Sequence, residues 1–252
     1  MEVALLTVGD ELLAGDTVNT NASWLAERLS ERGVTVARIL TIPDDRALIA
    51  RWVREYSDAF DAVIVTGGLG GTPDDVTIDA VADAFDRDLV VSEQALAAVE
   101  ETLSNIGDAV PDLEVDAEAE ATIPEGARPL LNPQGLSPGC VVENVYVFPG
   151  IPRELKAMFG TMAEEFDGDA VSRFLYTTEP EANMITALED VAEAFDVTVG
   201  CYPDREARHN RLKITATDEE TLGEAAAWLR EHVEVSETPI ERDWSRGEEL
   251  GN

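Results

Sequence analysis

Short apolar runs alternate with segments of helical periodicity along the first hundred residues, and this alternation constrains the fold more than any other feature. The runs at 3–8, 34–41 and 62–66 have the length and composition of buried strands. Amphipathic segments at 19–32 and 47–56 separate them. The pattern continues with a helix, a short strand and a helix at 76–85, 89–91 and 92–103. Strands joined by helices form βαβ units, so the sequence predicts an α/β fold with a mostly parallel sheet.

Turn-forming residues divide the chain into two parts. Periodicity fades over 104–137, and a hairpin is predicted over 140–148, followed by a helix that begins at Pro152 and extends to about Phe166. The run Asp167-Gly168-Asp169 is a candidate boundary, because a strand–helix–strand–strand–helix pattern follows it. We therefore expect a first domain, a small α+β domain and a tail, over 1–167, 168–238 and 239–252.

The charge of the chain excludes one class of partner and indicates an environment. Its 252 residues include 52 Asp and Glu but only 18 Lys and Arg, for a formal net charge of −34. General binding to nucleic acid needs clustered Lys and Arg, so we do not expect it. Acidic residues are spread along the chain and lysine is scarce, which resembles proteins of salt-accumulating halophiles and predicts a haloarchaeal origin. An ordinary acidic protein is the alternative.

The few cysteines and histidines exclude a Cys/His metal site. The chain contains Cys140, Cys201, His209 and His232, with no CxxC or HExxH motif. Any metal is therefore expected to be a hard, oxygen-bound ion. No apolar run reaches the roughly 18–20 residues that a bilayer crossing needs, and no basic segment precedes the first apolar run. We expect a cytoplasmic protein.

A glycine-rich stretch carries the strongest functional signal. The sequence TGGLGGT at 66–72 lies between a predicted strand and a predicted helix. Its glycines let backbone N–H groups approach an anion closely, and the positive N-terminus of the next helix would face that anion. The stretch is neither a Walker A loop nor a GxGxxG motif. It predicts phosphate binding; the alternative is a tight turn with Asp74 or Asp75 as helix N-cap.

Paired acidic residues follow each of the first three predicted strands. They are Asp10-Glu11, Asp44-Asp45 and Asp74-Asp75. The carboxyl ends of parallel strands meet at one edge of a sheet, where α/β proteins bind ligands. We therefore expect these carboxylates to share a crevice with the glycine stretch and to hold Mg²⁺ or another divalent cation. Helix capping or solvated surface is the alternative for each pair.

Five motifs, in order along the chain, resemble the MoaB/Mog-type molybdopterin-binding domain, in the version found at the N-terminus of the competence-damage-inducible protein CinA. They read GDELLAG with NTN (9–15, 19–21), TGGLG (66–70), DVT (75–77), NPQG with PG (132–135, 138–139) and FPGIP (148–152). The resemblance covers about residues 1–165. Residues 170–235 are similar to the small KH-like domain that follows in CinA proteins.

The resemblance implies roles for individual positions. Asp75 corresponds to the aspartate that Mog-type proteins place near the reacting phosphate and its metal, and Asp44 corresponds to their second functional aspartate. Glu11 belongs to the opening motif and is the third candidate catalytic residue; Asp75 and Asp44 are the candidate metal ligands. Gly71 stands where the family often has Pro. The implied phosphate- or ligand-binding residues are Thr66, Gly67, Gly68, Gly70, Gly71, Thr72, Asn21, Gly139 and Gly150.

The resemblance also implies an activity. CinA-like domains are associated with metal-dependent hydrolysis of the pyrophosphate bond of ADP-ribose and related dinucleotides. Mog-type relatives instead transfer AMP from ATP to molybdopterin, and a non-catalytic nucleotide- or pterin-binding module is a third interpretation. Relatives form dimers or trimers, so we expect a homo-oligomer. Because the sequence stops at Asn252, we expect neither the C-terminal amidohydrolase domain of full-length CinA nor its deamidation of nicotinamide mononucleotide.

The basic cluster REARHNRLK at 205–213 lies in the small domain. This domain lacks the GxxG loop with which true KH domains hold an RNA backbone. Three interpretations stay open for the cluster: a hairpin that contacts the acidic first domain or another subunit, a contact to an anionic substrate, and RNA binding.

Overall fold

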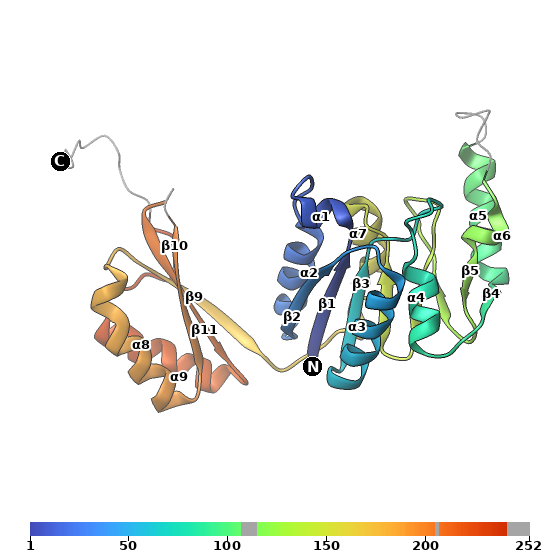
Figure 1. Ribbon diagram of the computed structural model, residues 1–252. Coiled ribbons are helices and arrows are strands. Elements are labelled where there is room, and N and C mark those ends of the chain that lie inside the picture. The colour runs from blue at the N-terminus through green and yellow to red at the C-terminus, as the bar shows by residue number, and fades with distance from the viewer. Residues whose placement is uncertain (107–114, 205–206, 241–252) are drawn as a thin grey trace. The chain divides into compact units, whose positions relative to one another are not determined.

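A computed structural model describes residues 1–106, 115–204 and 207–240 (Figure 1). The chain forms two compact units, Met1–Gly168 and Asp169–Asn252. Each unit has its own hydrophobic core, and each is described here by itself. In the part of the chain that the structure describes, no helix is both long and apolar enough to cross a membrane.

The first unit is built on a six-stranded sheet with strand order β2-β1-β3-β8-β7-β6. The four strands β2, β1, β3 and β8 are parallel, whereas β7 and β6 are antiparallel additions. This arrangement confirms the predicted α/β fold with a mostly parallel sheet. The strands are β1 (Glu2–Val8), β2 (Thr35–Ile42), β3 (Ala62–Thr66), β6 (Arg128–Leu130), β7 (Gly139–Val142) and β8 (Val145–Phe148).

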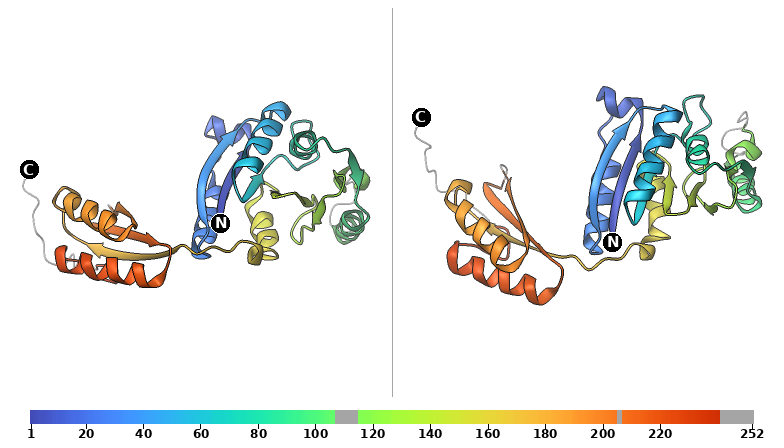
Figure 2. Two further views of the ribbon diagram at one scale, coloured as in Figure 1. Left: turned by 90° about the horizontal axis from the view of Figure 1, so that it is seen from below. Right: turned by 60° about the horizontal axis from the view of Figure 1, so that its bottom comes forward.

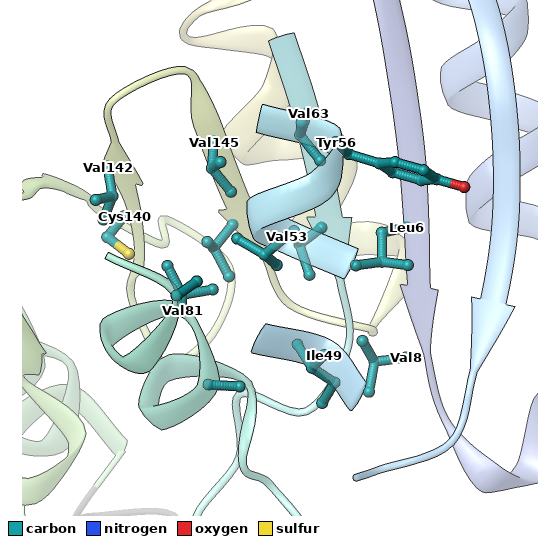
Figure 3. Close-up of a cluster of buried hydrophobic side chains, with 14 of the residues drawn as sticks. Leu6, Val8, Ile49, Val53, Tyr56, Val63, Val81, Cys140, Val142 and Val145 are labelled. Carbon is teal, nitrogen blue, oxygen red and sulfur yellow. The ribbon is translucent and has the colours of Figure 1, made fainter. Parts of the chain in front are cut away.

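Helices cover both faces of this sheet because its central strands are apolar on both sides. Alternate residues of β1 enter different cores: Leu6 and Val8 pack under α3 (Arg46–Ala59) and α4 (Thr77–Ala84). Figure 3 shows this cluster, in which Ile49 and Val53 of α3 meet the β1 side chains. Val3 and Leu5 face the opposite side, under α2 (Thr20–Glu31) and α7 (Pro152–Gly160). The result is a three-layer α/β/α unit.

The segment after α4 leaves the main sheet. The strand predicted at 89–91 forms as β4 (Leu89–Val91), but it pairs antiparallel with β5 (Thr122–Pro124) in a separate two-stranded sheet (Figure 1). The expectation that it continues the parallel pattern was therefore wrong. All three residues of β4 are exposed, so the strand lacks the two buried faces of a central parallel strand. The helices of this segment are α5 (Glu93–Ile106) and α6 (Ala117–Glu120).

Two further helical details differ from the prediction. After β1, where the sequence predicted no helix, the chain forms a short helix, α1 (Asp10–Ala14), which ends at Gly15 in the left-handed conformation. The helix that begins at Pro152 stops at Gly160 rather than near Phe166, and a short 3-10 turn, Ala163–Glu165, follows it. In α1 no residue is buried, so no apolar periodicity marks it in the sequence.

The second unit is a three-stranded antiparallel sheet with two helices (Figure 2). Its sheet order is β10-β11-β9, with β9 at Val171–Thr177, β10 at Thr198–Asp204 and β11 at His209–Ala216. The two helices α8 (Glu181–Phe195) and α9 (Glu219–His232) pack side by side on one face of the sheet. The basic cluster lies on the β10–β11 hairpin; its residues 205–206 and the predicted tail beyond 240 lie outside the described residues.

Candidate functional site

The strand order creates a crevice at the carboxyl ends of β1 and β3. The chain leaves β1 toward β2 on one side and later places β3 on the other side, so the loops after β1 and β3 diverge. Ligands of open α/β sheets bind at this kind of switch point. A cavity of about 460 Å³ lies there. It is lined by Val8, Gly9, Glu11, Asp44, Gly67, Gly68, Leu69, Gly70, Asp74, Asp75, Ser137, Pro149, Gly150, Ile151, Pro152 and Glu154.

Two glycines of the loop at 66–72 occupy backbone positions that other residues fill only with strain. Gly67 has φ +99°, and a Cβ there would lie 2.2 Å from the Val8 carbonyl oxygen. Gly68 has φ +65°, and a Cβ there would lie 2.3 Å from Oγ1 of Thr77. The glycines therefore let the ends of β1 and β3 and the start of α4 approach closely, which leaves the loop backbone facing the cavity. Phosphate binding by this loop stays a prediction.

Carboxylates from separate strand ends meet beside this loop. The Asp10 N–H donates to Oδ2 of Asp44 at 2.9 Å, which joins the ends of β1 and β2. Burial raises the pKa of Asp44 above its ordinary value, and the hydrogen bond from Asp10 opposes this rise. Negative charge on Asp10, Glu11 and Asp74 raises the same pKa further. Asp44 is therefore held in a concentration of negative charge that a bound cation would relieve.

Asp45, the neighbour of Asp44, has a different role. Its side chain accepts a hydrogen bond from the Leu48 N–H at 2.9 Å and caps α3. For Asp45 the capping alternative therefore holds, whereas Asp44 lines the cavity.

Asp75 holds the glycine loop rather than the helix that follows. Its Oδ2 accepts hydrogen bonds from the N–H and Oγ1 of Thr72, at 3.0 and 2.5 Å. The N-cap position of α4 is Val76, which provides no side-chain cap. The alternative in which Asp74 or Asp75 caps this helix was therefore wrong. Asp75 closes a turn at the cavity wall.

Two smaller cavities adjoin the first one. One of about 250 Å³ lies along Gly71 and Thr72 and reaches Glu120, whose Oε2 accepts a hydrogen bond from Ser137 at 2.7 Å. Gly68, Gly70 and Asp75 line both this cavity and the first one. The glycine loop therefore lies between the two cavities.

The second small cavity, of about 70 Å³, contains Asn21 and Thr66. Asn21 donates from Nδ2 to the Gly150 carbonyl oxygen at 2.6 Å, so α2 is joined to the FPGIP loop. Its Oδ1 is buried and makes no hydrogen bond. Glu11 and Gly150 line both this cavity and the large one.

Gly139 is the predicted ligand-binding residue that the structure places elsewhere. It is the first residue of β7 and is buried, and a Cβ there would lie 2.0 Å from the Val147 carbonyl oxygen. Its lack of a side chain is explained by close packing against β8. A ligand-binding role for Gly139 stays a prediction.

Sequence reasoning missed Glu154, which lies in the first turn of α7. It is 5% exposed and lines the same cavity as the glycine loop. Asn132 donates from Nδ2 to its Oε2 at 2.8 Å, and Gly135 packs against the carboxylate. A signal was present, since Asn132 and Gly135 of the NPQG motif both contact this side chain. An acidic residue in a first helical turn, however, is ordinarily a favourable surface feature.

Carboxylates of the cavity are the candidate ligands for a metal ion. Nowhere in residues 1–106, 115–204 and 207–240 are three or more Cys, His, Asp or Glu arranged to hold a metal ion. Asp44 and Asp75 both line the cavity and offer carboxylate oxygens. They fit a hard cation whose remaining ligands come from substrate phosphates and water, as is usual for Mg²⁺.

Fold and site together define an α/β protein with an acidic, glycine-lined cavity at a sheet switch point. Residues 4–167 match the family described as a probable molybdopterin binding domain. The chain belongs to that family. Residues 169–239 match the middle domain of FAD synthase, which gives no support to the expected KH-like relationship.

Proteins with related sequences span most of the chain. A protein of Archaeoglobus fulgidus is 36% identical over 233 residues, which are 92% of this chain and 97% of that protein. A CinA-like protein of Citrifermentans bemidjiense is 36% identical over 244 residues, covering 92% of this chain and 58% of that protein. The solved structure of CinA, of unknown function, from Thermoplasma acidophilum has 33% identity and a TM-score of 0.59, covering 66% of this chain and 99% of that one.

Proposed function

We propose that this protein binds a nucleotide phosphate on its glycine loop and hydrolyses the pyrophosphate bond of ADP-ribose or a related dinucleotide with the help of a divalent cation. The observation that carries the proposal is the meeting of this loop with Glu11, Asp44 and Asp75 around one cavity. The family match supports a nucleotide or pterin ligand. The second cavity beyond the loop provides room for the other half of a two-part substrate.

The residues divide the chemistry between them. The loop N–H groups bind one phosphate and stabilise the negative charge that develops on its oxygens as water attacks phosphorus. Asp75, hydrogen-bonded to Thr72, and Asp44, half-buried among carboxylates, bind the cation or orient the attacking water. Glu11 is the remaining candidate for a proton acceptor at this water. A divalent cation supplies polarisation of a phosphoryl oxygen and neutralises the phosphates.

Product analysis tests this proposal directly. The purified chain is incubated with ADP-ribose, FAD, NAD or ATP in the presence of Mg²⁺, Mn²⁺ or Co²⁺, and the nucleotides are separated by chromatography. We expect AMP from ADP-ribose or FAD, and no AMP once EDTA is added. Absence of turnover for all four substrates, in protein shown to be folded, would contradict the hydrolase proposal.

The family description favours a second candidate function, the binding of molybdopterin. A protein of this kind would use the same loop to hold the pterin phosphate, either to transfer AMP onto it or without catalysis. Incubation with molybdopterin and ATP distinguishes these cases, since transfer forms adenylylated pterin and pyrophosphate whereas a binding module forms neither.

Several expectations accompany the proposal. We expect a homo-oligomer in the cytoplasm of a halophilic archaeon, active in high salt, because screening offsets the repulsion of a net charge of −34. For the basic hairpin of the small unit, three roles stay proposals: a contact to the first domain or another subunit, a contact to an anionic substrate, and RNA binding. A KH-like role of this unit is likewise a proposal. Size measurement in molar KCl and in dilute buffer tests whether the protein forms a homo-oligomer and whether its assembly depends on high salt.

A further inference from the structure

Glu154 is a buried carboxylate that the mechanism above does not use. It lines the cavity from the side of α7, and its side chain is 6% exposed. A carboxylate taken out of water is costly unless hydrogen bonds or opposite charges replace the lost solvation. Its described partners are the Asn132 amide, which donates at 2.8 Å, and the Arg153 guanidinium, which forms an ion pair at 3.8 Å. The Arg153 side chain is 72% exposed, so its effect is screened by water.

The carboxylate therefore keeps acceptor capacity on the side of the cavity. An ionised carboxylate accepts about four hydrogen bonds. Asn132 fills one of these positions, and it also donates to the Ser137 carbonyl oxygen. If Glu154 only held this loop, it would need an oxygen that accepts a hydrogen bond but no charge. A glutamine would provide that oxygen at a lower desolvation cost. Glutamate instead places a carboxylate on the cavity wall, which indicates a second role toward a ligand.

The chemistry of the cavity selects which part of the ligand Glu154 meets. Phosphate oxygens are repelled by a buried carboxylate, so they belong at the glycine loop. The group beside Glu154 must donate hydrogen bonds. In a nucleoside phosphate, the first donor group beyond the phosphate is the pair of ribose hydroxyls, and two carboxylate oxygens match two adjacent hydroxyls. Acidic residues bind ribose hydroxyls in the same way at the switch point of dinucleotide-binding folds.

We propose that Glu154 binds the 2′- and 3′-hydroxyls of the ribose attached to the loop-bound phosphate and so selects ribonucleotides. This inference rests on the proposed function, because it requires a nucleoside phosphate in the cavity. It makes Glu154 a specificity-determining residue, with Asn132 as the residue that positions its carboxylate.

Calorimetric titration with AMP, 2′-deoxy-AMP and 2′,3′-dideoxy-AMP tests the inference without any turnover. For the wild type we expect AMP to bind at least about tenfold more tightly than dideoxy-AMP, as expected for hydrogen bonds to a charged group. In Glu154→Gln, AMP binding should weaken to nearly the affinity for dideoxy-AMP, and dideoxy-AMP binding should stay the same. Glu164→Gln is the matched control, since it makes the same substitution at an exposed position of the same unit.

Each result has a distinct meaning. If Glu154→Gln weakens AMP and dideoxy-AMP equally, Glu154 only holds the loop and the inference is wrong. Equal affinity of the wild type for all three nucleotides overturns the inference but leaves the proposed function intact, whereas no binding of AMP or ADP-ribose overturns both. Should Glu154→Gln not fold, Glu154→Asp keeps the charge but withdraws it from the hydroxyls, so the preference for AMP should again fall.

Discussion

The two units differ in where they place buried polar groups and unusual backbone conformations. In the first unit, Asn21, Thr66 and Glu154 are buried polar residues that line the cavities at the carboxyl edge of the sheet. Gly67 and Gly68, with positive φ, lie at the same edge. In the second unit, positive φ occurs at Asp196, which ends α8, and at Arg208 in the β10–β11 hairpin.

This difference locates function in the molecule. Positive φ at a helix end or hairpin is an ordinary solution to turning the chain. A positive φ beside buried polar atoms at a sheet edge lowers the stability of the folded protein, and packing alone does not offset the loss. Such strained positions cluster at binding sites. In the second unit the buried polar residues Thr177 and His209 belong to strands β9 and β11. The first unit contains the candidate site, because there the positive-φ glycines and buried polar residues also line a cavity of about 460 Å³.

The largest expected effect is on turnover in the first unit. Asp75→Asn should lower the rate of ADP-ribose hydrolysis by on the order of 100-fold or more, because the charge is lost while an amide oxygen still accepts from Thr72. Nucleotide binding should persist. Asp88→Asn, at an exposed position of the same unit, is the control. Unchanged turnover in Asp75→Asn would remove Asp75 from the mechanism.

A pair of glycine substitutions tests the comparison through stability. Gly67→Ala should destabilise the first unit by roughly 2–4 kcal/mol, because the new Cβ meets the Val8 carbonyl oxygen at a positive φ. Gly223→Ala, in α9 with nothing within 4 Å of its Cβ, should instead stabilise the second unit by about 0.5–1 kcal/mol. Denaturant unfolding measures both. Similar effects at the two positions would break the distinction between the units.

The adjacent residues Asp44 and Asp45 distinguish a role in the cavity from a role in stability within the first unit. Asp45→Ala should cost about 1 kcal/mol of stability through loss of the α3 cap, with turnover per folded molecule unchanged. Urea unfolding combined with a rate assay gives both quantities. A large loss of turnover in Asp45→Ala would show that the cap position also serves the site.

The smallest effect concerns Asp44 and depends on pH. Because its pKa is raised in the folded protein, ionisation of Asp44 favours unfolding, and its stabilising contribution is lost as pH rises through the raised pKa. Asp44→Asn should therefore slightly raise the melting temperature of the first unit near pH 7. The gain should disappear below the ordinary aspartate pKa of about 3.9. Bound Mg²⁺ should reverse the ranking, since the wild type gains a ligand that Asn cannot replace. A lower melting temperature of the variant at pH 7 without Mg²⁺ would contradict this account.

Much of the fold was predictable because local interactions define its elements. The strand at 62–66 occurs as predicted, and the second unit has the predicted strand–helix–strand–strand–helix order. The parallel sheet followed from the alternation of such elements. The placement of β4 did not follow, because its three exposed residues contain no information about which strand they pair with.

The sequence by itself determined the α/β class, the position of the glycine loop and the acidic residues at the strand ends, because these depend on neighbours along the chain. Only the tertiary structure decided which of those residues meet. It joined Asp44 to the Asp10 backbone, assigned Asp45 to a helix cap and Gly139 to strand packing, and turned Glu154 into the cavity. The physical reason is that strand order, rather than sequence spacing, sets the distances between side chains at a sheet edge.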